Sequence, residues 1–82
     1  MEAMYRIAQG QVEAMEFHVV QASNVCGHNL SELPIKRGIL VAYIIRGREL
    51  IIPSGRDFIK SGDHVIVVTK GHAVVNIDDI LE

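Results

Sequence analysis

The sequence predicts a small α+β domain with a four-stranded, mixed or antiparallel sheet, the element order β-α-β-β-β-α and a central hairpin over residues 39–52. β-Branched and other apolar residues fill Ile39–Arg46 and His64–Thr69, as in buried strands. Residues 73–81 instead carry apolar side chains at helical spacing, which predicts an amphipathic helix at the end of the chain.

The first fifteen residues differ in character from the rest. Apolar residues recur there at helical spacing: Met1, Met4, Tyr5 and Ala8. Gly10 then interrupts the pattern, so we expect a short helix over residues 2–9 and a linker to Met15, with a weakly ordered terminus as the alternative. The predicted division is therefore helix and linker over residues 1–15 and a folded domain over residues 16–82.

A strand and a short helix open the folded domain. Residues 16–22 alternate as expected of a first strand. Asn29 lies three positions before Glu32, which is the spacing of a capping box, so a single helical turn is expected to begin at Asn29. Pro34 ends this turn, because proline disfavours helical geometry in the residue before it.

The central hairpin is defined by its glycine and its proline. Gly47 supplies the positive φ of a two-residue turn, either as Arg46-Gly47 or as Gly47-Arg48. Pro53 ends the second arm, since proline cannot donate a hydrogen bond to a sheet. A second turn at residues 60–63 leads into the strand His64–Thr69.

Both faces of the predicted sheet are apolar. Successive side chains of a strand point to opposite faces of the sheet. Along Ile39–Arg46, and again within His64–Thr69, the side chains on both faces are apolar. An antiparallel sheet with one hydrated face alternates apolar and polar residues instead. Either the sheet curls into a closed core or a second copy of the chain covers the spare face, and we expect a homodimer.

Composition excludes several classes of protein. The chain has 82 residues, enough for one domain, and its 8 basic and 10 acidic residues argue against non-specific nucleic-acid binding. Cys26 is the single cysteine, so no internal disulfide can form, and with no signal-peptide pattern we expect a cytoplasmic setting. The apolar run over residues 39–45 is too short to cross a membrane.

No catalytic or metal-binding pattern is visible. Cys26 and His28 lie two positions apart, but no third group or oxyanion site accompanies them, so we predict no enzyme activity; a small enzyme using this pair is the alternative. The histidines show no metal-ligand spacing, which predicts no metal: His18, His28, His64 and His72.

Two features could bind an anion. Gly55 and Arg56 could accommodate a phosphate, although a plain turn at residues 53–57 is the favoured interpretation. A modest basic cluster surrounds the hairpin: Lys36, Arg37, Arg46, Arg48 and Arg56. Two such clusters at a dimer axis could hold a small anionic ligand, whereas the alternative is solvated charges that limit edge pairing.

Short motifs in a fixed order carry a resemblance to a known family. They are Gly-x-x-Leu-x-x-Leu at Gly27, Leu30 and Leu33; Ile-x-Arg-Gly at Ile44, Arg46 and Gly47; Ile51-Ile52-Pro53; and Gly-Asp-x-Val-x-Val at Gly62, Asp63, Val65 and Val67. With the terminal amphipathic segment, residues 16–81 resemble the TrkA C-terminal domain, also called RCK-C, of bacterial potassium-uptake regulators.

The resemblance implies a cytoplasmic regulatory domain, usually dimeric, that lies at the inner face of the cell membrane and controls a membrane cation transporter subunit. It also implies an upstream Rossmann (RCK-N) domain that binds NAD or ATP. No Gly-x-Gly-x-x-Gly occurs in this chain, so that nucleotide site is not expected within it.

Some members of the family bind cyclic di-AMP between two C-terminal domains. The matching positions in this chain are Ile35, Lys36, Leu40 and Pro53. The sequence departs from the binders in a shorter loop between Lys36 and Leu40, and in a lysine where arginine is more usual. A ligand-sensing domain of a transcription regulator and a purely oligomerising module are the alternative functions.

Overall fold

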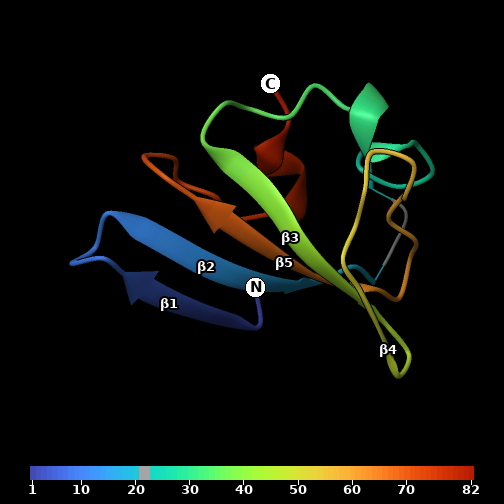
Figure 1. The fold of residues 1–82 in the computed structure, drawn as a ribbon, viewed down its shortest axis with the longest axis horizontal. Coiled ribbons are helices and arrows are strands. Elements are labelled where there is room, and N and C mark those ends of the chain that lie inside the picture. Colours follow the sequence, from blue (N-terminus) through green and yellow to red (C-terminus); the bar gives the residue numbers. More distant parts are fainter. Residues whose placement is uncertain (21–22) are drawn as a thin grey trace.

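The computed structural model describes residues 1–20 and 23–82, which form a five-stranded antiparallel sheet in the order β1-β2-β5-β3-β4 (Figure 1). The strands are β1 (Ala3–Ile7), β2 (Val12–His18), β3 (Ile39–Arg46), β4 (Glu49–Ile51) and β5 (His64–Thr69). Two short 3₁₀ turns accompany them, η1 (Leu30–Glu32) and η2 (Ile77–Ile80). No helix in the described part of the chain is long and apolar enough to span a membrane.

The central hairpin and the strand His64–Thr69 are confirmed. β3 pairs with β4 across a turn in which Gly47 has φ 62°, the left-handed conformation that glycine tolerates best. β3 also pairs along most of its length with β5. The predicted helical turn after Asn29 is confirmed as η1, where the Glu32 carboxylate accepts the Asn29 N–H at 3.3 Å.

The predicted N-terminal helix is wrong, and the sheet has five strands rather than four. Residues 3–7 form β1, which pairs antiparallel with β2 across a turn where Ala8, Gln9 and Gly10 all have positive φ. An isolated helix of one or two turns is only marginally stable in water. Pairing with β2 instead provides hydrogen-bond partners for backbone N–H and C=O groups of β1. The expected division of the chain after Met15 falls inside β2. The predicted first strand covers residues 16–22, of which residues 21–22 lie outside the described residues.

The expected C-terminal helix is reduced to η2. The chain leaves this turn in an extended conformation at Leu81, which forms an isolated bridge with Ile35. The Lys36 N–H donates to the Ile80 carbonyl at 2.9 Å, and the Glu82 N–H donates to the Pro34 carbonyl at 2.8 Å. Pairing with residues 34–36 therefore replaces the continued helix that the apolar spacing predicts.

The core lies against one face of the sheet. Residues of the three central strands are buried there, alternating along β2 and β5 and separated in β3 by a register shift between Val41 and Tyr43: Met15, Phe17, Val41, Ile44, Val65 and Val67. Buried residues from the loops and from η2 pack against them: Val19, Val25, Ile59, Val74 and Ile80. Full burial of such a side chain contributes about 1.5–3 kcal/mol, and the aliphatic character of this core matches the low aromatic content.

Candidate functional site

A groove lies where the start of β3 meets η1 and the segment that follows β4. Its volume is about 340 Å³, and its lining comprises Leu30, Ser31, residues 35–41 and residues 53–55. All four residues that the resemblance singled out line this groove: Ile35, Lys36, Leu40 and Pro53. We call it the β3 groove.

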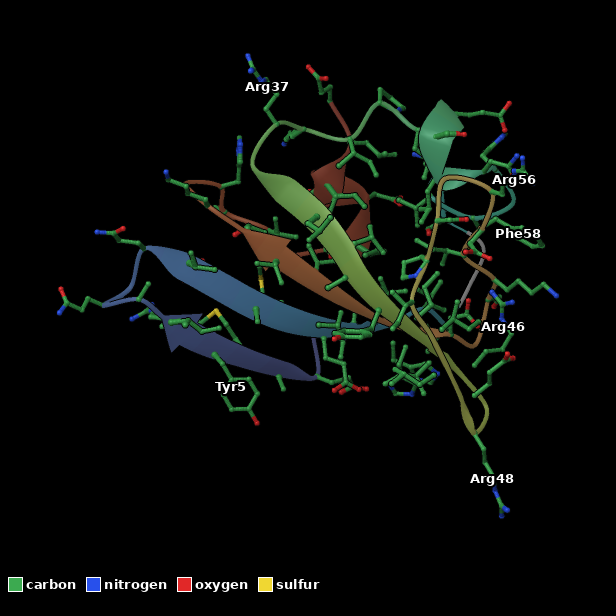
Figure 2. The ribbon with its side chains drawn as sticks, in the orientation of Figure 1. Tyr5, Arg37, Arg46, Arg48, Arg56 and Phe58 are labelled. Atoms are coloured by element: carbon green, nitrogen blue, oxygen red, sulfur yellow. The ribbon has the colours of Figure 1, made fainter. Side chains whose placement is uncertain are left out.

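The lining of the β3 groove combines apolar, hydroxyl and cationic groups. Ile35, Leu40 and Pro53 supply apolar surface, and Ser31 contributes a hydroxyl. Lys36, a half-buried residue, adds an ammonium group, and Arg37 reaches into solvent beyond the start of β3 (Figure 2). Such a lining suits a ligand with an apolar ring and a negative charge.

Backbone contacts fix one wall of the groove. Besides the bonds between residues 34–36 and the C-terminal segment, the Lys70 N–H donates to the Gly38 carbonyl at 2.8 Å. His72 Nε2 lies 2.6 Å from the Arg37 carbonyl oxygen, so Nε2 carries the hydrogen of this bond. Gly38 has φ 85°, and a Cβ at this position would lie 2.9 Å from the Lys70 carbonyl oxygen, so the wall requires glycine there.

The opposite wall depends on Gly55. The Ser31 N–H donates to the Gly55 carbonyl at 3.0 Å, and a Cβ on Gly55 would lie only 3.0 Å from Ser31 Cβ. The Asp57 carboxylate accepts the Ser54 N–H at 2.7 Å, which closes a turn at this point. The favoured interpretation of residues 53–57 as a turn fits this geometry, with glycine serving close packing against η1.

The predicted basic cluster is only partly brought together. Lys36 and Arg37 line the groove, whereas Arg48 projects from the tip of the β3–β4 hairpin (Figure 2). Arg46 is held by Asp63: Nε donates to Oδ1 at 3.0 Å and Nη2 donates to Oδ2 at 2.9 Å. Its guanidinium also lies 5.8 Å from the Phe58 ring centroid.

The Arg46–Asp63 pair joins two of the motifs read in the sequence, Ile-x-Arg-Gly and Gly-Asp-x-Val. Asp63 is 1% exposed and also accepts the Lys60 N–H at 2.8 Å. Burial by itself raises the pKa of Asp63, but the hydrogen bonds from Arg46 and Lys60 outweigh burial and hold this pKa below its usual range. The hydrogen bond to Asp63 raises the pKa of Arg46 in turn.

Two aspartates have structural roles that the sequence did not indicate. The Asp78 carboxylate accepts the N–H groups of Asn24 and Val25 at 3.2 and 3.3 Å, which ties the loop before η1 to η2. The Asp79 carboxylate accepts the Val75 and Asn76 N–H groups at 2.9 Å each. The bond from Asn76, followed by that from Val75, lowers the pKa of Asp79.

The pair considered for catalysis is not assembled by hydrogen bonding. Cys26 Sγ lies 3.7 Å from Ser23 Oγ, and His28 is exposed. Within residues 1–20 and 23–82, no group of three or more histidine, cysteine, aspartate or glutamate side chains is arranged to hold a metal ion.

Much of the second face of the sheet is apolar, as the sequence predicts, and exposed, although Glu16, His18 and His64 form a polar patch within it. We call it the outer sheet face; its most exposed apolar members are Tyr5 at 69%, Leu40 at 62%, Leu50 at 60%, Ile7 at 54% and Tyr43 at 39%. Strand register places half-buried apolar residues between them: Ala14, Ile45, Ile66 and Val68. Leu40 belongs both to this face and to the β3 groove.

Fold and site together describe a small β-sheet domain with a groove of about 340 Å³ beside an exposed apolar sheet face. The TrkA-C domain family matches residues 14–81, and the chain belongs to this family. The resemblance read from the motifs is thereby confirmed. β1 lies outside the matched residues.

Similar proteins include components of potassium uptake systems. The chain is 33% identical over 73 residues to the Trk system potassium uptake protein TrkA homolog 2 of Methanosarcina mazei, covering 89% of the chain and 16% of the relative. It is 31% identical over 77 residues to the Trk system potassium uptake protein TrkA of Streptomyces coelicolor, covering 94% of the chain and 34% of the relative. It is 31% identical over 64 residues to the Trk system potassium uptake protein TrkA of Haemophilus influenzae, covering 74% of the chain and 14% of the relative. The chain thus spans about a third or less of these relatives.

Proposed function

We propose that this domain is a dimer-forming regulatory unit of a potassium or other cation uptake system, acting at the inner face of the cell membrane. Membership of the TrkA-C family and the similarity to potassium uptake proteins support this role. The structural observation that carries the proposal is the junction at Leu40, where a ligand-sized groove adjoins an uncovered apolar face. A ligand in the groove would thereby contact the edge of a dimer interface.

The outer sheet face is the proposed dimer interface. An exposed apolar surface that extends across several strands costs free energy in water, and burial against a second copy recovers about 25 cal/mol per Å². A chain of 82 residues buries a smaller fraction of its own surface than a larger domain does, so such a contribution is large relative to its stability. A two-fold axis would place the β3 grooves of both copies at the margins of one interface.

The proposed ligand is a purine nucleotide with a bridging phosphate, such as cyclic di-AMP. The apolar side chains of Ile35, Leu40 and Pro53 would contact the purine, and Lys36 would contact the phosphate. A volume of about 340 Å³ falls at the lower end of the range for small-molecule pockets, which suits one base per groove.

Calorimetric titration with cyclic di-AMP, ATP and NAD tests the ligand. We expect heat with cyclic di-AMP alone and a loss of at least tenfold in affinity in Lys36→Gln. Arg48→Gln is the matched control, since Arg48 lies at the hairpin tip, outside the groove lining. The absence of heat with all three ligands would leave a purely oligomerising role.

Sedimentation velocity tests the dimer separately. We expect the chain to sediment as a dimer at micromolar concentration, and Leu40→Glu to sediment as a folded monomer, because it places a charge in the proposed interface. Lys70→Glu changes an exposed residue beyond the end of β5 and serves as control. A monomer at high micromolar concentration in the unmodified chain would refute dimerisation.

A further inference from the structure

Two histidines meet on the outer sheet face, away from the β3 groove. His18 on β2 lies directly opposite His64 on β5 in the antiparallel register. Their imidazole rings are stacked, with centroids 4.3 Å apart and an angle of 6° between the ring planes. The two residues are far apart in the sequence, so only the strand pairing reveals that they form a pair.

Each ring has a carboxylate beside its Nδ1 atom. His64 Nδ1 lies 2.8 Å from Glu16 Oε2, and His18 Nδ1 lies 3.9 Å from Glu2 Oε1. An ionised carboxylate can only accept a hydrogen bond, so Nδ1 of His64 carries the proton and the lone pair of the neutral ring is on Nε2. A carboxylate at one ring nitrogen is the usual environment of a histidine that binds a metal ion through the other.

The pair is open to solvent. The side chain of His18 is 37% exposed and that of His64 is 35% exposed, so an ion can reach both rings. Because the ring planes are nearly parallel, both rings must tilt toward each other before their Nε2 atoms can bind one ion at about 2.0–2.1 Å. The broad energy minimum for rotation about the Cβ–Cγ bond of histidine allows such a tilt.

We propose that His18 and His64 form a two-histidine site for a divalent transition-metal ion such as Zn²⁺, Ni²⁺ or Cu²⁺. Nε2 of each ring is the ligand, and Glu16 is a positioning residue that holds the His64 ring through Nδ1. Water, or side chains of a second copy packed on the same face, completes the coordination. Imidazole ligands favour these ions over Mg²⁺ and Ca²⁺, which require oxygen ligands.

Thermal unfolding of the full chain with added metal tests the site. We expect Zn²⁺ at about ten times its Kd to raise Tm by at least about 5 °C, and Mg²⁺ to leave Tm unchanged. His18→Gln and His64→Gln should each abolish the Zn²⁺ response, and Glu16→Gln should weaken affinity by about 10–100-fold. His28→Gln is the matched control, since His28 is exposed and lies outside the pair.

A spectroscopic measurement keeps the result independent of stability. Substoichiometric Cu²⁺ should broaden the NMR signals of the His18 and His64 rings before those of His28 and His72. Equal broadening of all four rings would overturn the proposal. So would a Zn²⁺ response that survives unchanged in both His18→Gln and His64→Gln.

Discussion

The buried carboxylate of Asp63 is expected to carry a large share of the stability of this small domain. Asp63→Asn removes its charge while retaining its size, and leaves Arg46 without its ionic partner. Removing one partner of a buried pair costs about 3–5 kcal/mol, but water can still reach Arg46, whose side chain is 32% exposed. Asparagine also retains one oxygen that can accept the Lys60 N–H. We therefore expect a loss of about 2–3 kcal/mol in the free energy of unfolding.

Urea unfolding followed by circular dichroism measures this loss. For a chain of this size the urea dependence of the free energy of unfolding is about 1 kcal/mol per M, so the midpoint should fall by about 2–3 M. Arg48→Gln on the same hairpin should change the free energy by less than about 0.5 kcal/mol. The effects of Asp63→Asn and Arg46→Gln should be less than additive, because both break the same pair. Strict additivity, or a midpoint shift within error of that for Arg48→Gln, would show that the pair does not stabilise the fold.

The pH dependence of stability provides a second measurement on the same pair. The pKa of Asp63 is lower in the folded chain than in the unfolded chain, where it is about 3.9. Its contribution is therefore fully present above that unfolded value and is lost as the pH falls through the folded pKa. We expect the stability of the unmodified chain to fall below about pH 4 and the stability of Asp63→Asn to fall less steeply there.

Two further substitutions test how the loops are held. Gly38→Ala, at φ 85° with its Cβ 2.9 Å from the Lys70 carbonyl oxygen, should lower the unfolding free energy by about 2 kcal/mol in urea and weaken any ligand bound in the β3 groove. Asp78→Ala removes the acceptor for the Val25 N–H and should cost about 1 kcal/mol. Faster hydrogen exchange at the Val25 amide, with unchanged exchange in the centre of β5, would accompany that loss.

The sequence predicted the central strands well because their signal is local. β-Branched residues, a glycine able to adopt positive φ and a terminal proline each act within a few residues of the hairpin. The N-terminal prediction failed because the spacing of Met1, Met4 and Tyr5 fits a helix in a short window, whereas the pairing that decides the outcome involves β2. The C-terminal prediction failed in the same way, since Leu81 pairs with Ile35.

The candidate groove illustrates the same limit. The four residues predicted to bind a ligand were chosen by family resemblance, and all four line the β3 groove. The contacts that shape its walls come from distant residues, such as His72 at the Arg37 carbonyl and the C-terminal segment at Lys36. Periodicity cannot reveal such contacts, and the Arg46–Asp63 pair was visible only as two separate motifs.

Under the proposed function, the ligand and the dimer must be thermodynamically linked. A ligand changes the pairing of two domains only if it binds one arrangement more tightly, and the change in dimer affinity equals that preference. Leu40, shared by the groove and the outer sheet face, is the residue through which contact with the ligand would alter contact with the partner. Coupling of about 1–3 kcal/mol is typical, so saturating cyclic di-AMP should change the dimer dissociation constant by about 5–150-fold. Analytical ultracentrifugation with and without the ligand measures this ratio, and Lys36→Gln should return it to one. If the ligand binds but the dimer dissociation constant is unchanged, the β3 groove and the outer sheet face are not coupled. That result would refute regulation through pairing.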